Sequence, residues 1–360
     1  MSDRPAAADA ERLAAARAEF DAEVVYLNTA TLGLPPRRTM AAVMAALDDW
    51  RRGTVDAAAF DTAVEASRRD YARLVGVDPS WVALGSQVSS LVGLVAASLP
   101  QGSEVLTATG DFTSVLFPFL ARSGRGLTVR EAPLEGLADA VTPSTTLVAA
   151  SAVQSADGRI VDADALVEAC EAVGARTLID TTQATGWLPI DAARFTYTAG
   201  GGYKWLLAPR GTAFFTVAPD HRDDLVPVAA SWYAGEDRWS SIYGSPLRLA
   251  ADARRFDVSP AWHSWVGQAA SLGFLLEVGA PALHTHATGL AERFCAKVGL
   301  PDVGSAIVSA TADEAVPDLL RGAGIVAATR AGRLRLSFHV STSESDVDLA
   351  AEVLAGHLAA

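Results

Sequence analysis

The alternation of short apolar segments with helix-length segments, which begins near residue 80, constrains the fold most strongly. The segments "WVALG", "EVLTATG", "TTLVAAS" and "RTLIDTT" have the composition of buried strands, and the stretches between them are long enough for helices. Parallel strands require such crossover connections, which are right-handed. The pattern therefore predicts an α/β fold with a mostly parallel central sheet and helices on both faces. "TYTAGGG" and "GTAFFTV" predict two further strands.

Changes in this pattern divide the chain into three segments. Residues 1–20 are a charged, Ala-rich helix former, and residues 21–258 hold the large α/β domain. Residues 259–360 begin with a long helix and continue as a small C-terminal α/β domain, in which "RLRLSFHV" alternates Arg with apolar residues as a half-buried strand does.

An irregular aromatic segment lies near the end of the large domain. Its side chains either pack against the protein or form the wall of a pocket for a bulky substrate, and both interpretations stay open; they are Trp232, Tyr233, Trp239 and Tyr243.

Composition excludes several classes of partner. The formal net charge is −13, and the short Arg pairs lie among acids, so we expect no binding to nucleic acid. No apolar run is long enough to span a bilayer, so no membrane association is expected. Cys170 and Cys295 lie far apart in sequence and suggest no disulfide framework, which is typical of a cytoplasmic protein.

One lysine stands out in a chain that uses arginine almost everywhere. Of 29 basic side chains only Lys204 and Lys297 are lysines. Lys204 lies between "GGY" and "WLL", where desolvation lowers the pKa of an amine and makes it nucleophilic. A solvated surface lysine is the alternative, but this chain would be expected to use Arg there.

Two other polar clusters follow predicted strands, where ligands bind in open α/β sheets. "GSQVSS" opens a helix whose first backbone amides favour an anion, although Ser86 as an ordinary helix cap is an equal alternative. "LIDTTQATG" places Asp180 at a strand end, with Gln183 three residues later. A reactive lysine, a carboxylate and an anion site together are what pyridoxal 5'-phosphate (PLP) requires.

The chain resembles the class V aminotransferase family of fold-type I PLP-dependent enzymes, a group that also contains cysteine desulfurases, C–S lyases and epimerase-like enzymes. "DTTQATGWLPID" and "GGYKWLLAPRGTAF" carry the most specific part of the resemblance. It extends from "VVYLNTATLGLPP" to "RLRLSFHVSTSESDVD".

The resemblance implies a role for each matching residue. Lys204 would form the Schiff base with PLP, and Asp180 would pair with the pyridinium nitrogen. Arg335 would bind the carboxylate of an amino-acid substrate, with Asn28 in the same substrate site. The remaining cofactor contacts implied are the ring hydroxyl for Gln183, ring stacking for Phe112, and the phosphate for Ser86, Gln87, Val88 and Tyr203.

Several residues depart from the family pattern. Phe112 stands where a stacking His is commoner, so no imidazole lies over the ring. No cysteine precedes the C-terminal strand, which argues against a persulfide-forming desulfurase. Ser259 replaces the usual Gly-Thr pair of a cross-subunit phosphate contact. His284 and His286 lack further ligands, so we expect no metal site and a solvated helix face.

The resemblance implies a homodimeric enzyme that acts through a carbanion at Cα of a small-molecule amino-acid substrate. We expect transamination, with C–S β-elimination or epimerisation as alternatives. A non-catalytic binding protein on the same fold is the alternative outside enzymes. Retention of Lys204, Asp180, Gln183 and Arg335 together argues against it.

Overall fold

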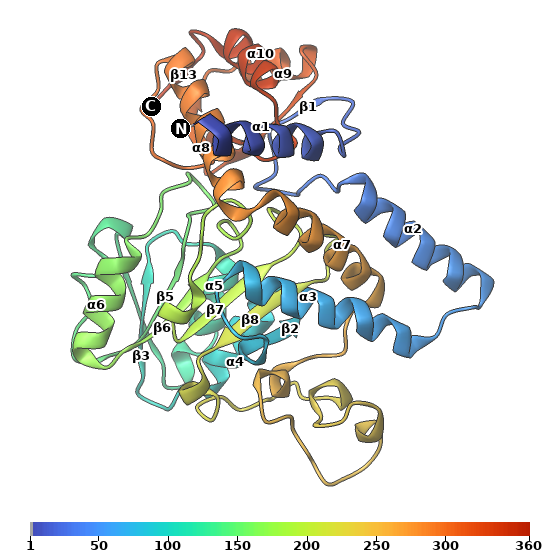
Figure 1. Cartoon of the computed structure of the whole chain (residues 1–360). Helices are drawn as coiled ribbons and strands as arrows, with labels where there is room; N and C mark the ends of the chain where they lie inside the picture. Colours follow the sequence, from blue (N-terminus) through green and yellow to red (C-terminus); the bar gives the residue numbers. More distant parts are fainter. Residues whose placement is uncertain (1–2) are drawn as a thin grey trace.

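The computed structural model describes residues 3–360, with side chains from Ala10 onward. Its centre is a seven-stranded sheet with the order β2-β8-β7-β6-β5-β3-β4 (Figure 1). The strands are β2 (Val82–Gly85), β3 (Glu104–Ala108), β4 (Thr128–Ala132), β5 (Thr145–Ser151), β6 (Arg176–Asp180), β7 (Tyr197–Gly201) and β8 (Ala213–Val217).

The sheet is mostly parallel, as the alternation predicts. β4, β3, β5, β6 and β7 run parallel to one another, whereas β8 is antiparallel to both β7 and β2. All seven residues of β5 except Thr146 are buried, because helices cover both faces of the sheet.

The two faces are covered by different helices. Leu147 and Ala149 of β5 face a core with α4 (Val88–Ser98) and α5 (Thr113–Leu120). Val148 and Ala150 face the opposite side, in a core with α6 (Ala163–Val173). The rest of that opposite face packs against α3 (Phe60–Leu74) and α7 (Trp262–Val278).

The C-terminal part forms a smaller α/β unit, in agreement with the sequence. An antiparallel sheet with the order β11-β12-β9-β13 packs against helices (Figure 1). Its elements are α8 (Ala280–Val298), β9 (Ile307–Ala312), α9 (Val316–Gly322), β11 (Ala328–Arg330), β12 (Arg333–Ser337), α10 (Glu344–Leu354) and β13 (Leu358–Ala359). The expected half-buried strand is β12, but it is more deeply buried than predicted: Arg335 is only 1% exposed.

The N-terminal segment lies against this small unit. The predicted N-terminal helix is α1 (Asp3–Arg17), and β1 (Val25–Tyr26) then pairs parallel with β10 (Ile325–Val326). Asn28 forms an isolated parallel bridge with Ser337. Residues 25–28, expected in the large domain, therefore pair with strands of the C-terminal part.

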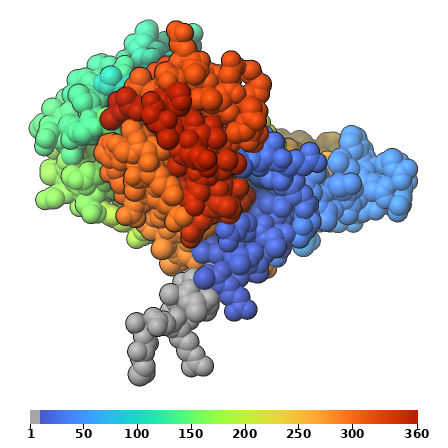
Figure 2. All heavy atoms as spheres, turned by 90° about the horizontal axis from the view of Figure 1, so that it is seen from above, coloured from blue at the N-terminus to red at the C-terminus, as the bar shows by residue number. Residues whose placement is uncertain are grey.

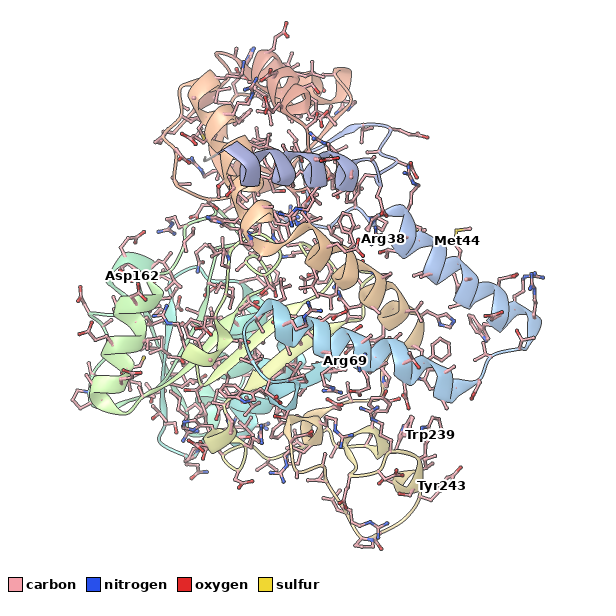
Figure 3. The ribbon with its side chains drawn as sticks, in the orientation of Figure 1. Arg38, Met44, Arg69, Asp162, Trp239 and Tyr243 are labelled. Atoms are coloured by element: carbon pink, nitrogen blue, oxygen red, sulfur yellow. The ribbon has the colours of Figure 1, made fainter. Side chains whose placement is uncertain are left out.

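Two segments project from the body of the molecule. Helix α2 (Arg37–Arg52) extends outward in both views (Figures 1 and 2). The aromatic segment forms a lobe beside the N-terminal end of α3, where Trp239 and Tyr243 are labelled in Figure 3. Within residues 3–360 no single helix meets the length and hydropathy of a membrane span; the pair α7–α8, bent by 83°, meets them only jointly.

Candidate active site

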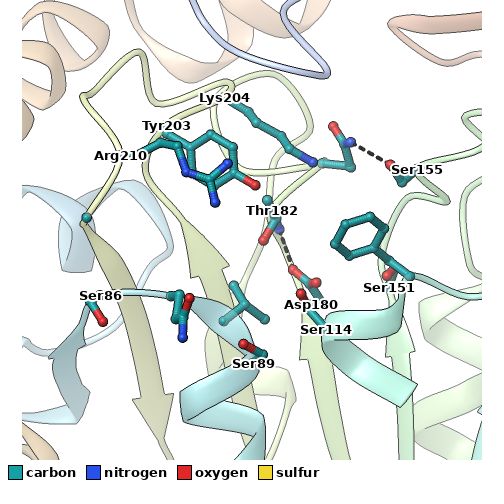
Figure 4. A pocket seen from close by; sticks show the side chains of 15 residues that line it. Ser86, Ser89, Ser114, Ser151, Ser155, Asp180, Thr182, Tyr203, Lys204 and Arg210 are labelled. Atoms are coloured by element: carbon teal, nitrogen blue, oxygen red, sulfur yellow. Dashed lines mark hydrogen bonds between the residues drawn. The ribbon is translucent and has the colours of Figure 1, made fainter. Parts of the chain in front are cut away.

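A cavity of about 380 Å³ lies beyond the carboxyl ends of the central strands (Figure 4). β5 and β6 end at Ser151 and Asp180, and the turn after β7 brings in Lys204. Its lining consists of Ser86, Gln87, Val88, Ser89, Phe112, Ser114, Ser151, Ser155, Asp180, Thr182, Gln183, Tyr203, Lys204, Arg210 and Gly211. The cavity thus unites most of the predicted site residues.

Lys204 points into this cavity with its amine largely withdrawn from water (Figure 4). The residue is 5% exposed, and its Nζ lies 5.4 Å from the ring centroid of Phe112 and 5.7 Å from that of Tyr203. Burial lowers the pKa of Lys204 to about 8, against an opposing contribution from Asp180. The expected desolvation of this lysine is confirmed.

The turn that carries Lys204 is fixed by a close approach of another segment. The amide of Gly33 donates to the carbonyl of Tyr203 at 2.9 Å. A Cβ on Gly33 would lie 2.0 Å from the carbonyl oxygen of Lys204, so only glycine fits this position.

Asp180 lies at the end of β6 and is 5% exposed. Its Oδ1 accepts a hydrogen bond from the amide of Thr182 at 2.8 Å. Burial raises the pKa of Asp180 to about 6, and the nearby carboxylate of Asp111 adds to the rise. A cationic ring nitrogen placed against this carboxyl would favour its ionised form.

The start of α4 supplies unsatisfied backbone amides. Its N-cap is Gln87, whose side chain makes no capping hydrogen bond and instead donates to Ser90 Oγ at 3.1 Å. The alternative of a cap by Ser86 is therefore wrong. Amides left free at a helix N-terminus favour an anion, and Val88 and Ser89 open the helix at the cavity wall.

Phe112 reaches the cavity from the N-cap position of α5. The carboxylate of Asp111 accepts hydrogen bonds from the Phe112 amide at 2.6 Å and from both the amide and the hydroxyl of Ser151. Asp111 therefore holds Phe112 in place relative to the end of β5. Asp111 was not foreseen from the sequence, although its position after a strand is the signal that identified Asp180.

The side-chain amide of Gln183 forms hydrogen bonds with other residues of the chain. Its Nε2 donates to Ala30 O at 2.9 Å and to Ser155 Oγ at 3.0 Å, and its Oε1 accepts from Trp205 Nε1 at 2.8 Å. A contact of Gln183 with a ring hydroxyl stays a prediction. Such a contact would require the side-chain amide of Gln183 to share or give up its hydrogen bond to Ser155.

Arg335 lies behind the cavity wall and touches it through Ser155. Nη1 donates to the Ser155 carbonyl at 2.5 Å, and Nη2 donates to Thr31 Oγ1 at 2.7 Å. Burial lowers the pKa of Arg335 to about 10, and no carboxylate of residues 10–360 forms a salt bridge with it. The buried Oδ1 of Asn28 has no hydrogen-bond partner among the side chains and backbone that the structure describes. The unpaired cation of Arg335 suits a ligand carboxylate, and the free Oδ1 of Asn28 suits a hydrogen-bond donor of the ligand.

Arg210 and Tyr203 form one side of the cavity. The Arg210 guanidinium lies 4.5 Å from the ring centroid of Tyr203 (Figure 4). Burial raises the pKa of the Tyr203 hydroxyl, so it keeps its proton at neutral pH. Arg210, like Ser114, Ser151, Ser155 and Thr182, was not foreseen from the sequence.

The aromatic segment does not line this cavity. Tyr233 is buried and donates to Asp61 Oδ1 at 2.6 Å, Trp239 Nε1 donates to Asp61 Oδ2 at 3.1 Å, and Tyr243 is 91% exposed. The interpretation as a substrate-pocket wall within this chain is wrong, because hydrogen bonds direct the segment toward α3.

The histidine pair is not a solvated face either. His284 Nδ1 lies 3.2 Å from the Trp187 carbonyl and His286 Nε2 lies 3.1 Å from the Thr342 carbonyl, and both rings are partly buried. Among residues 10–360 no group of three potential metal-ligating side chains is present.

The family model described as aminotransferase class-V matches residues 25–315. The chain belongs to this family. Isopenicillin N epimerase from Streptomyces clavuligerus is 32% identical over 253 residues, which cover 63% of this chain and 62% of the epimerase. An uncharacterized aminotransferase of Bacillus subtilis is 29% identical over 249 residues, 66% of each chain. The aligned part of this chain thus spans less than two thirds of the length of each of these two relatives.

Solved structures agree on the fold of this class V chain. The cystine C–S lyase C-DES, in complex with cysteine persulfide, superposes with a TM-score of 0.84 at 22% identity, covering 93% of this chain and 98% of the lyase. A variant of C-DES with glycine covalently linked to its PLP cofactor gives a TM-score of 0.86 at 22% identity, covering 95% and 99%. The predicted fold-type I α/β architecture is confirmed.

PLP is the cofactor of this class V enzyme, and the cavity fits it. The uncapped amides of α4 suit a phosphate, the buried Asp180 suits a protonated ring nitrogen, and the amine of Lys204 is free to bind an aldehyde. Phe112 lies close enough to Lys204 to cover a ring placed there.

Covalent capture of PLP by Lys204 is expected to become faster as the pH rises through about 8. The neutral amine is the nucleophile, and a pKa lowered from 10.5 makes it abundant at a lower pH than in an ordinary lysine. The measurement is the rate of visible-absorbance change when PLP is added to the cofactor-free protein across a pH series. A midpoint near 10.5 would contradict the desolvation of Lys204.

Proposed function

We propose that this class V enzyme acts on an α-amino acid and that its reaction is transamination. The observation that carries the proposal is the set of proton carriers in the cavity. Lys204 is the only amine in the described lining, which contains no histidine or cysteine. Cys170 and Cys295 are buried elsewhere, and burial raises the pKa of both thiols to about 11.

Three residues of the chain would have separate roles in this reaction. When bound, PLP acidifies the hydrogen on Cα of the substrate. Arg335 would bind the α-carboxylate and so direct Cα toward Lys204. Lys204, with its pKa of about 8, would take that proton and, for transamination, deliver it on the same side to the carbon that came from the cofactor aldehyde rather than back to Cα. Asp180 would keep the ring nitrogen protonated. Proton transfer by a single base favours transamination over epimerisation.

Epimerisation is the second candidate. It requires a proton donor besides Lys204, and the protonated hydroxyl of Tyr203 is the available group in the cavity lining. The similarity to an isopenicillin N epimerase supports this candidate. A C–S β-elimination lyase, the remaining alternative, needs only a leaving group on the substrate.

One experiment distinguishes these reactions. The holoenzyme is incubated in D2O with single amino acids, with and without a 2-oxo acid acceptor. Transamination yields one equivalent of the corresponding oxo acid and, with acceptor, continued turnover. Epimerisation yields the opposite enantiomer with deuterium at Cα and no oxo acid. Elimination releases ammonia, the leaving group and a 2-oxo acid that lacks this group, whereas transamination releases no ammonia. Absence of oxo acid from every amino acid tested would overturn the transaminase assignment.

We also propose that the chain forms a homodimer through the projecting helix α2. Apolar side chains follow one another at helical spacing along it, and they are exposed: Met40, Met44, Leu47 and Trp50 are 44%, 62%, 42% and 64% exposed (Figure 3). Light scattering of the purified protein tests this. A mass of 37.4 kDa, that of one chain, would contradict it.

A further inference from the structure

Two arginine side chains from the C-terminal strands meet at one hydroxyl. Thr31 Oγ1 accepts a hydrogen bond from Arg335 Nη2 at 2.7 Å and another from Arg330 Nη2 at 3.2 Å. Because both nitrogens reach the same oxygen, the two guanidinium groups are close neighbours. Like charges at such a separation repel each other and favour the binding of anions.

Neither guanidinium has an acidic partner in the part of the chain whose side chains the structure describes. No Asp or Glu of residues 10–360 forms a salt bridge with Arg330 or Arg335, although the chain carries a net charge of −13. Other arginines do find carboxylates: Arg68 pairs with the buried Asp257 at 2.6 Å, and Arg293 with Asp348 at 2.8 Å. The positive charges of Arg330 and Arg335 beside Thr31 are therefore available to bind an anionic ligand.

The pair extends from the interior to the surface beside the catalytic lysine. Arg335 is 1% exposed and contacts the cavity wall through Ser155, whereas Arg330 is exposed at the end of β11. The charges of both arginines lower the pKa of Lys204, and that of Arg330 also lowers the pKa of Arg335. Arg335, Arg330 and Lys204 thus belong to one electrostatic site.

We propose that the substrate is an α-amino acid whose side chain carries a second carboxylate, and that Arg330 binds this carboxylate while Arg335 binds the α-carboxylate. The inference rests on the proposed action on an amino acid. A substrate with one carboxylate would neutralise one guanidinium and leave its neighbour unpaired. A dicarboxylate neutralises both, and the exposure of Arg330 places the second anion toward solvent.

The test uses isosteric pairs of amino acids, glutamate with glutamine and aspartate with asparagine. Each is titrated into the PLP-loaded protein, and the change in visible absorbance gives an apparent dissociation constant. We expect the wild type to bind at least one acid up to about fivefold more tightly than its amide, since an exposed charge pair contributes up to about 1 kcal/mol. In Arg330→Gln this preference should fall to roughly one, with binding of the amides little changed.

Arg333→Gln is the matched control. Arg333 faces Arg330 across the β11–β12 pair, but it donates to Ser309 and Thr311 rather than to Thr31. Its loss removes the same charge from the same hairpin and should leave the preference for acids intact. Added salt should reduce the wild-type preference and have no such effect in Arg330→Gln.

Three outcomes would overturn the inference. Equal wild-type affinity for acids and amides would mean that no second anion is recognised. An equal weakening of acids and amides in Arg330→Gln would mean that Arg330 supports only the α-carboxylate. Binding of none of the four amino acids by the PLP-loaded protein would contradict the proposed amino-acid function itself, and the inference with it.

Discussion

Replacement of Lys204 by alanine is expected to reduce turnover by roughly 10,000-fold or more, because the variant loses both the amine that binds PLP and the base that moves the Cα proton. The fold should survive, since the amine has no hydrogen-bond partner among the described residues and its burial is unfavourable. The measurement is steady-state turnover, together with mass spectrometry after borohydride reduction. In the wild type the reduced cofactor should remain attached to the peptide that contains Lys204.

The second lysine provides a matched control. Lys297 lies on α8 with its side chain 43% exposed and forms a salt bridge with Asp348 at 3.3 Å. Lys297→Ala should keep the covalently bound cofactor and normal turnover. Turnover near the wild-type level in Lys204→Ala, or attachment of the cofactor at Lys297, would contradict the assignment of Lys204.

Replacement of Arg335 by alanine should raise the apparent KM for amino acids by about 100-fold, the effect of losing a bidentate, charge-assisted pair worth roughly 3 kcal/mol. Loading of PLP should change far less, since Arg335 contacts the wall behind Ser155 rather than the residues at α4 or Asp180. Initial rates at varied substrate concentration and a PLP titration separate the two effects.

Arg335→Lys distinguishes charge from geometry. Lysine keeps the positive charge but not the planar fork that matches a carboxylate, so its KM should lie between those of the wild type and Arg335→Ala. An unchanged KM in both variants would mean that the carboxylate is bound elsewhere.

The sequence predicts the sheet and the centre of the site because both depend on local patterns. Strand-like and helix-length segments alternate with little interruption, and parallel strands bring their carboxyl ends to one edge. Asp180, Lys204 and the start of α4 therefore meet in one cavity as expected. The composition, with two lysines against 27 arginines, and the segments "GGY" and "WLL" on either side together single out Lys204.

What the sequence does not predict are contacts between loops that are distant in the chain. Arg335 was expected on a half-buried strand, but Thr31 and Ser155 come over its end and bury it. Gln183 was assigned to the cofactor alone, whereas its amide connects Ala30, Ser155 and Trp205. Such partners depend on how the segment around residue 30 crosses the molecule, and no periodicity encodes that path.

The aromatic lobe illustrates a different difficulty. Trp and Tyr are equally suited to a pocket wall and to a packed surface, so composition could not decide between them. The carboxylate of Asp61 on α3, which accepts from both Tyr233 and Trp239, settles the position of the segment within this chain.

The close packing of Gly33 gives the enzyme a direct mechanical connection between its two binding groups. One short stretch of chain is tied to the small unit by the bridge from Asn28 to Ser337, touches Arg335 through Thr31, and ends with Gly33 hydrogen-bonded to the turn that carries Lys204. No side chain at Gly33 is available to absorb a displacement. A shift of Arg335 upon closing on a carboxylate would therefore reach the backbone of the reactive amine through the three residues Thr31, Leu32 and Gly33, so that capture of the substrate and alignment of the base would become a single movement.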